Sequence, residues 1–123
     1  MVEAVEVVDV PAPADPRLVT IEVRAAGVAF PELLQTRGLY QLKPDLPFVP
    51  GAEVAGTVVS APEGCDLQPG DRVCALTMLG GLAERAVAAD PESGLAGELD
   101  GLVVDAVQQA RGEQPADGTL IGL

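Results

Sequence analysis

Side chains that usually carry enzyme chemistry are scarce in this sequence, which contains no histidine. A serine–histidine–aspartate triad, a cysteine–histidine pair and an imidazole general base are therefore all excluded. A zinc ion would need four ligands drawn from two cysteines and carboxylates, which is an unusual set. The sequence thus predicts no metal site and leaves the carboxylates, one tyrosine and two thiols as candidates.

The two thiols, Cys65 and Cys74, lack the Cys-x-x-Cys spacing of redox and metal motifs. Cys74 falls in a predicted strand, which indicates a buried and inert thiol. Cys65 falls in a predicted turn and is the one expected to be exposed, although no base lies near it in sequence. The acidic N-terminus lacks the features of a signal peptide, so a cytoplasmic protein with two free thiols is expected.

Length and composition predict one small globular domain. The chain has 123 residues, of which 48% are hydrophobic, enough to bury a core. Its net charge of −12 is spread along the chain, and both nucleic acid and anionic membrane surfaces would repel it. No stretch reaches the roughly 18 apolar residues that a membrane span needs. Nucleic acid and membranes are therefore not expected as partners.

Valine-rich segments bounded by proline and glycine predict a chain that is mainly β. The expected strands cover residues 3–10, 18–26, 53–60, 72–77 and 82–88. A short helix is expected over 30–37, with Pro31 in its first turn and Gly38 at its end. Gly56 lies inside a predicted strand, which indicates a bulge or a close backbone approach.

The last part of the chain has a different pattern. Apolar residues at helical spacing predict a helix over 95–111, although glycines in its first half could delay its start to Asp100. A short strand over 119–123 could then close the structure. The expected architecture is a small, partly open barrel or sandwich, with the helix covering an opening or an edge.

Four blocks of sequence, taken in order, resemble a known family. They are Val23–Tyr40, Pro47–Gly56, Pro69–Val73 and Gly80–Glu84. Together they are similar to the GroES-like N-terminal domain of the medium-chain dehydrogenase/reductase superfamily, in its zinc-free quinone oxidoreductase branch. The resemblance covers residues 3–89 and implies a GroES-like, partly open β-barrel over 1–89. Residues 90–123 are then expected to form a helix and strand that pack on the same domain.

The resemblance also implies what these residues do not contain. Family members continue into a Rossmann domain, whereas Gly80-Gly81 lies between two predicted strands and too few residues follow Ala89. The chain is therefore expected to be the substrate domain alone, truncated after residue 89. It should need no cofactor itself, with NADPH bound only if a partner chain supplies the nucleotide domain.

Candidate site residues come from positions matched to the family. The usual Asn-Phe pair is matched by Ala29-Phe30, which removes an amide near the nicotinamide, and the usual Asp is matched by Glu32. Tyr40 matches a tyrosine of the substrate cleft, where its phenol could donate to a carbonyl oxygen, or it is an ordinary half-buried aromatic. Glu53 matches an acidic residue near the metal of zinc-binding relatives, and here it is either a structural hydrogen-bond partner or a perturbed carboxylate. The catalytic candidates are Tyr40, Glu32 and Glu53, and the predicted substrate pocket consists of Ala29, Phe30, Leu33, Tyr40, Met78 and Leu79.

Three functions follow from the resemblance. In the first, the domain binds a hydrophobic or carbonyl-bearing small molecule and catalyses a non-redox step such as a cyclisation, dehydration or isomerisation. In the second, it is a binding or assembly module, a homodimer or a complex in which a partner covers the apolar face left without its Rossmann domain. In the third, it is one half of a split oxidoreductase. Autonomous NADPH-dependent hydride transfer is not expected, because the acceptor must sit within about 3–3.5 Å of the nicotinamide.

Overall fold

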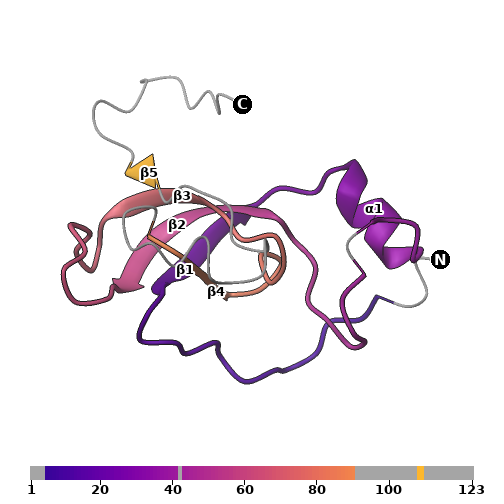
Figure 1. The fold of residues 1–123 in the computed structure, drawn as a ribbon, viewed down its shortest axis with the longest axis horizontal. Coiled ribbons are helices and arrows are strands. Elements are labelled where there is room, and N and C mark those ends of the chain that lie inside the picture. The colour runs from indigo at the N-terminus through magenta and orange to yellow at the C-terminus, as the bar shows by residue number, and fades with distance from the viewer. Residues whose placement is uncertain (1–4, 42, 91–107, 110–123) are drawn as a thin grey trace.

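The computed structural model describes residues 5–41, 43–90 and 108–109. Its strands are β1 (Val19–Ala26), β2 (Glu53–Ser60), β3 (Arg72–Leu76), β4 (Arg85–Ala88) and β5 (Gln108–Gln109), and its helix is α1 (Phe30–Thr36). The strands form one antiparallel sheet in the order β4-β1-β2-β3-β5. Figure 1 shows the sheet at one end of the molecule and α1 at the other, joined by long loops.

The core lies on one face of this sheet. Side chains alternate between the two faces of a strand, so every second residue of β1 to β4 points inward. The inward residues are Val19, Ile21, Val54, Val58, Val73, Ala75, Ala86 and Ala88. Small and β-branched residues of this kind are typical of half-buried strands. The mainly β, partly open GroES-like fold is confirmed, with β4 and β5 at the two ends of the strand order.

Gly56 marks a close contact between β1 and β2. It pairs with Val23 across β1, where the register shifts between Val23 and Ala25. A Cβ atom at this position would collide with the backbone carbonyl oxygen of Glu22. The predicted close backbone approach is therefore confirmed.

Helix α1 ends as its sequence predicts. Gly38 has a φ of 68° and lies one residue beyond the cap, Arg37. The Gly38 N–H donates to Gln35 O at 3.0 Å and the Leu39 N–H donates to Leu34 O at 2.8 Å. This pair of bonds is a Schellman motif, which favours glycine because its left-handed backbone strains residues with a side chain.

Two predicted strands differ from the structure. Residues 5–10 form no strand, and their valines are exposed, since none of the described strands pairs with them and prolines follow at once. Positions 3 and 4 lie outside the described residues. The strand expected over 82–88 begins only at Arg85, because the Leu82 N–H donates to Pro50 O at 2.9 Å and so holds that segment on a different loop.

The helix predicted over 95–111 is wrong at the two residues of it that the structure describes. Gln108 and Gln109 pair with Cys74 and Val73 as strand β5. The free edge of β3 offers unpaired backbone groups, and these compete with a helix already weakened by glycines. The rest of that prediction, and the strand expected over 119–123, lie outside the described residues.

Candidate functional site

Glu32 ties the start of α1 to a distant loop. Its side chain is only 5% exposed. One carboxylate oxygen accepts the Ala29 N–H at 2.7 Å, and the other accepts the Ala52 N–H at 3.2 Å. The first bond is the acidic half of a capping box, which satisfies a backbone donor that the helix start would otherwise leave unpaired. Both carboxylate oxygens thus already have structural hydrogen bonds.

Ala52 extends this connection to the loop after β3. Its carbonyl oxygen accepts the Thr77 N–H at 2.7 Å and the Met78 N–H at 3.4 Å. The Thr77 hydroxyl also donates to Gly51 O at 2.8 Å. We call the chain of contacts from Glu32 through Ala52 to Met78 the relay. It joins α1 to the 77–79 loop, so two of the segments in the predicted pocket lie on one hydrogen-bonded frame.

Met78 has an unusual backbone within this frame. Its φ is 60°, in the left-handed region that is strained for residues with a side chain. Such strain persists only where the surroundings fix the backbone, and it is concentrated at functional sites. The adjacent Leu79 N–H donates to Thr77 O at 2.6 Å, which tightens the turn.

Apolar side chains around the start of α1 are exposed to solvent. The exposed fractions are 76% for Val28, 67% for Phe30 and 39% for Leu33. Ala29 is also exposed, whereas Met78 and Leu79 are half-buried. The predicted pocket therefore corresponds to an apolar surface at the start of α1, and its function as a substrate pocket stays a prediction.

The three predicted catalytic residues occupy different settings. Tyr40 is half-buried in the bend after α1, whereas Glu53 is exposed at the start of β2. A Cβ atom on Gly27 would lie 2.6–2.8 Å from Glu53 side-chain atoms, so that side chain covers Gly27. Within the part of the chain that is described, no hydrogen bond joins Tyr40, Glu32 and Glu53, and their catalytic roles stay predictions.

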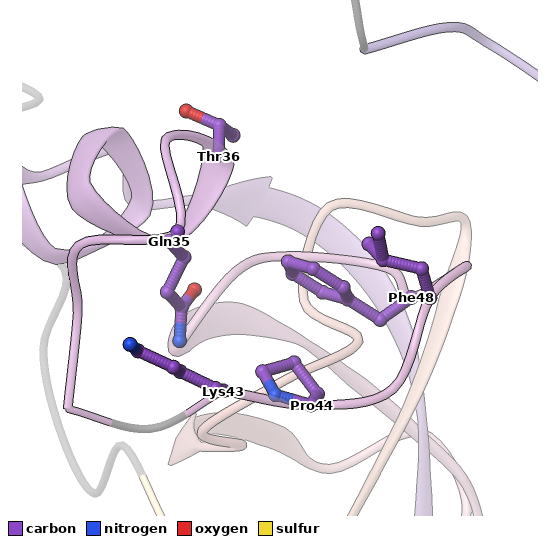
Figure 2. A pocket seen from close by; sticks show the side chains of 7 residues that line it. Gln35, Thr36, Lys43, Pro44 and Phe48 are labelled. Atoms are coloured by element: carbon purple, nitrogen blue, oxygen red, sulfur yellow. The ribbon is translucent and has the colours of Figure 1, made fainter.

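A hollow lies on another side of α1. It is formed by the helix end with the segment 43–48, and its volume is about 180 Å³. Its lining residues are Gln35, Thr36, Gly38, Lys43, Pro44, Leu46 and Phe48. Figure 2 shows the Gln35 side chain pointing between Lys43, Pro44 and Phe48, whereas Thr36 points away. The sequence analysis did not predict this site, and none of its lining residues belongs to the predicted substrate pocket.

The thiols are arranged opposite to the prediction. Cys74 is exposed, because its neighbours Val73 and Ala75 occupy the inward positions of β3. Cys65 is half-buried and packs against the core. Burial raises the pKa of the Cys65 thiol above its ordinary value. The hydrogen bond with Asp90 and the negative charge of Asp90 also raise this pKa, whereas a backbone hydrogen bond from Leu67 lowers it.

Neither a metal cluster nor a membrane span is found in the described ranges. No group of three or more Cys, Asp or Glu residues there could hold a metal ion. No helix among the same residues is long and apolar enough to cross a membrane.

Fold and sequence together define a GroES-like domain of the dehydrogenase type. The alcohol dehydrogenase GroES-like domain family matches residues 15–109, and the chain belongs to this family, within the medium-chain dehydrogenase/reductase superfamily. The match starts later and ends later than the expected 3–89. It therefore includes β5.

Several known relatives are quinone oxidoreductases or quinone oxidoreductase-like proteins. It is 45% identical over 83 residues to a rat quinone oxidoreductase, covering 66% of this chain and 25% of that protein. A probable oxidoreductase from Mycobacterium abscessus is similar with a TM-score of 0.61 and 55% identity, over 67% of this chain and 26% of that chain. A quinone oxidoreductase from Thermus thermophilus, also solved in complex with NADPH, is similar with a TM-score of 0.54 and 38% identity, over 71% of this chain and 28% of that chain. The chain thus spans about a quarter of the length of these relatives.

Proposed function

We propose that this domain binds a hydrophobic or carbonyl-bearing small molecule on the apolar surface at the start of α1. The observation that carries the proposal is the relay, which holds the base of α1 against the strained turn at Met78. Phe30 and Leu33 are exposed beside this frame, where they can contact an apolar ligand. Similarity to quinone oxidoreductases supports a carbonyl compound as the ligand class.

Tyr40 is the donor that we assign to the ligand carbonyl. Its phenol has no hydrogen bond to another described residue, so it can donate to a carbonyl oxygen. Glu32 is assigned a positioning role, because backbone N–H groups already occupy both of its oxygens. A non-redox step such as a cyclisation, dehydration or isomerisation would rely on the shape of this surface, with Tyr40 and Glu53 as the available acid–base groups.

We propose that the described residues do not form a binding site for a nicotinamide nucleotide. A phosphate cradle needs free backbone N–H groups in a glycine-rich turn that leads into a helix. Here the Gly80 N–H donates to Val49 O at 2.7 Å and the Gly81 N–H donates to Gly51 O at 2.9 Å. The 80–81 turn is thus committed to the fold, and we propose that any nucleotide unit is supplied by a separate domain or chain.

The test is a titration of the 15N-labelled chain with acetophenone, a carbonyl-bearing aromatic that does not alkylate thiols. Amide shifts are expected at Phe30, Leu33, Met78 and Leu79, and Tyr40→Phe should weaken binding several-fold. Phe30→Ala should also weaken it, whereas Val7→Ala, a fully exposed apolar control, should not. Absence of shifts at these four residues, or NADPH oxidation by the chain alone, would overturn the proposal.

The exposed apolar side chains also favour a second function, that of an assembly module. Val28, Phe30 and Leu33 expose apolar area that water solvates poorly and that a second protein surface could cover. A homodimer, or the substrate half of a split oxidoreductase, would bury them. Light scattering at micromolar concentration distinguishes the two functions: a dimer that Leu33→Glu dissociates supports assembly, and a monomer argues against a homodimer.

A further inference from the structure

The hollow between the end of α1 and the segment 43–48 contains a buried polar atom without a partner. Gln35 is only 7% exposed, and its Oε1 is shielded from solvent with no hydrogen-bond donor among the described residues. A buried acceptor left unpaired destabilises the folded protein, so such atoms are rare. Because this acceptor points into the hollow, a molecule that enters can supply the missing donor (Figure 2).

The position of Gln35 is fixed by the backbone. Its carbonyl oxygen accepts the Gly38 N–H in the Schellman motif, which also places Gly38 on the wall of the hollow. The carboxylate of Glu32, one helical turn earlier, anchors the same face of α1 to Ala52. The backbone that carries Gln35 is therefore fixed before any ligand arrives, and burial of the residue restricts its side chain, which lowers the entropy cost of binding.

The remaining walls define the shape and charge of an occupant. Pro44, Leu46 and Phe48 supply apolar contacts, and the Phe48 ring extends toward Gln35 in Figure 2. Lys43 is the only lysine of the chain and lies on the same wall. No described residue forms an ion pair with it. Its ammonium gives a local positive charge within a protein of net charge −12.

The volume is sufficient for a single ring. A cavity of about 150 Å³ accommodates benzene, and this hollow measures about 180 Å³. One six-membered ring with two small substituents fits this space.

We propose that the hollow is a binding site for a monocyclic phenolic carboxylate, a hydroxybenzoate. Its hydroxyl donates to Gln35 Oε1, its carboxylate accepts from the Lys43 ammonium, and its ring packs against Phe48 and Pro44. This site is distinct from the apolar surface at the start of α1, so the two proposals are tested independently of each other.

The experiment is a titration of the 15N-labelled 123-residue chain with 4-hydroxybenzoate, benzoate and phenol. The expected dissociation constant of 4-hydroxybenzoate is below about 1 mM, within the ordinary range for a ligand of about ten non-hydrogen atoms. Amide shifts should gather at Gln35, Gly38, Lys43 and Phe48. Absence of binding up to about 10 mM, or shifts centred instead on Phe30 and Leu33, would overturn the proposal.

Two variants separate the two polar contacts. Gln35→Leu keeps the size of the side chain but removes the acceptor, so it should weaken 4-hydroxybenzoate about tenfold and leave benzoate within about twofold. Lys43→Met should weaken both carboxylates about fivefold or more and leave phenol unchanged. Arg37→Met removes a positive charge outside the lining residues and serves as the matched control.

Folding is monitored by urea denaturation of each variant. Gln35→Leu removes an unpaired buried acceptor and is expected to fold at least as well as the parent. Because Lys43 is exposed, its variant keeps the proposal testable even if Gln35→Leu is poorly folded. Equal affinity of the parent and Lys43→Met for 4-hydroxybenzoate, or a crystal structure with water alone on Gln35 Oε1 at saturating ligand, would refute the site.

Discussion

Replacing Glu32 by alanine should destabilise the domain more than any other loss of a single acidic side chain among the described residues. The carboxylate accepts two backbone N–H groups, from Ala29 at 2.7 Å and from Ala52, 20 residues after Glu32 in sequence, at 3.2 Å. Hydrogen bonds to a charged group contribute about 1.5–3 kcal/mol each. Since Glu32 is 5% exposed, water cannot easily replace the lost acceptor, and the expected cost is about 3–5 kcal/mol.

Glu32→Gln isolates one of the two bonds. The amide oxygen can accept one N–H, but the amide nitrogen then faces the other N–H as a second donor. The expected cost is about 1.5–3 kcal/mol, intermediate between the parent and alanine. Glu63→Ala is the matched control, because Glu63 is an exposed turn residue and should change the stability by no more than about 0.5 kcal/mol.

The assay is urea denaturation at neutral pH, with equal m-values as evidence that only stability has changed. Amide hydrogen exchange provides a local measurement, since the Ala29 and Ala52 amides should lose protection first. A free energy of unfolding for Glu32→Ala within about 1 kcal/mol of the parent would refute the relay. Unchanged exchange at Ala52 would likewise show that this contact does not hold α1 to the loop.

Three further predictions concern the sheet and the thiols. By urea denaturation, Gly56→Ala should lower the free energy of unfolding by about 2–3 kcal/mol or more, because its Cβ meets a backbone carbonyl that cannot move aside. Gly64 has a φ of 85° but open space around it, so Gly64→Ala should lower the free energy of unfolding by only about 1 kcal/mol. Equal costs would contradict the close approach. At pH 8, Ellman's reagent should modify exposed Cys74 before Cys65, whose raised pKa keeps it protonated. The stabilisation from neutral Cys65 is fully present below the ordinary thiol pKa and is lost as pH rises through the raised pKa. Asp90→Asn should lower the pKa of Cys65 and speed its modification, and an unchanged rate would contradict the proposed influence of Asp90.

Local signals in the sequence predicted β2 and the end of α1. The bounds of β2 match the expectation, and α1 ends just before Gly38, where the backbone angle favours glycine. The strand expected over 3–10 is wrong in its described part. A strand forms only where another strand offers backbone partners, and an alternating pattern of valines does not show whether such a strand is present. The helix predicted over 95–111 is wrong at Gln108 and Gln109 for the converse reason, because the free edge of β3 offers backbone groups with which these residues pair.

The site was predicted less completely than the fold. Glu32 was selected for catalysis by its match to the family, but an acid three residues after the N-cap of a helix is also the mark of a capping box. That signal was present in the sequence and indicates the role the structure shows. The hollow at Gln35 had no such signal, because it forms between α1 and a segment that only the tertiary fold brings together.

Helix α1 unites these observations because its amphipathic pattern is inverted. An ordinary surface helix buries apolar residues and exposes polar ones. Here the buried residues are Glu32 and Gln35, three positions apart on one face, while Phe30 and Leu33 are exposed on another. Burying two polar side chains and solvating two large apolar ones both disfavour folding in isolation. The cost at Glu32 is offset by two hydrogen bonds, but Gln35 Oε1 and the exposed apolar side chains have no such compensation among the described residues. Selection for stability alone would remove both features, so the inversion itself favours ligand or partner contacts on two sides of α1.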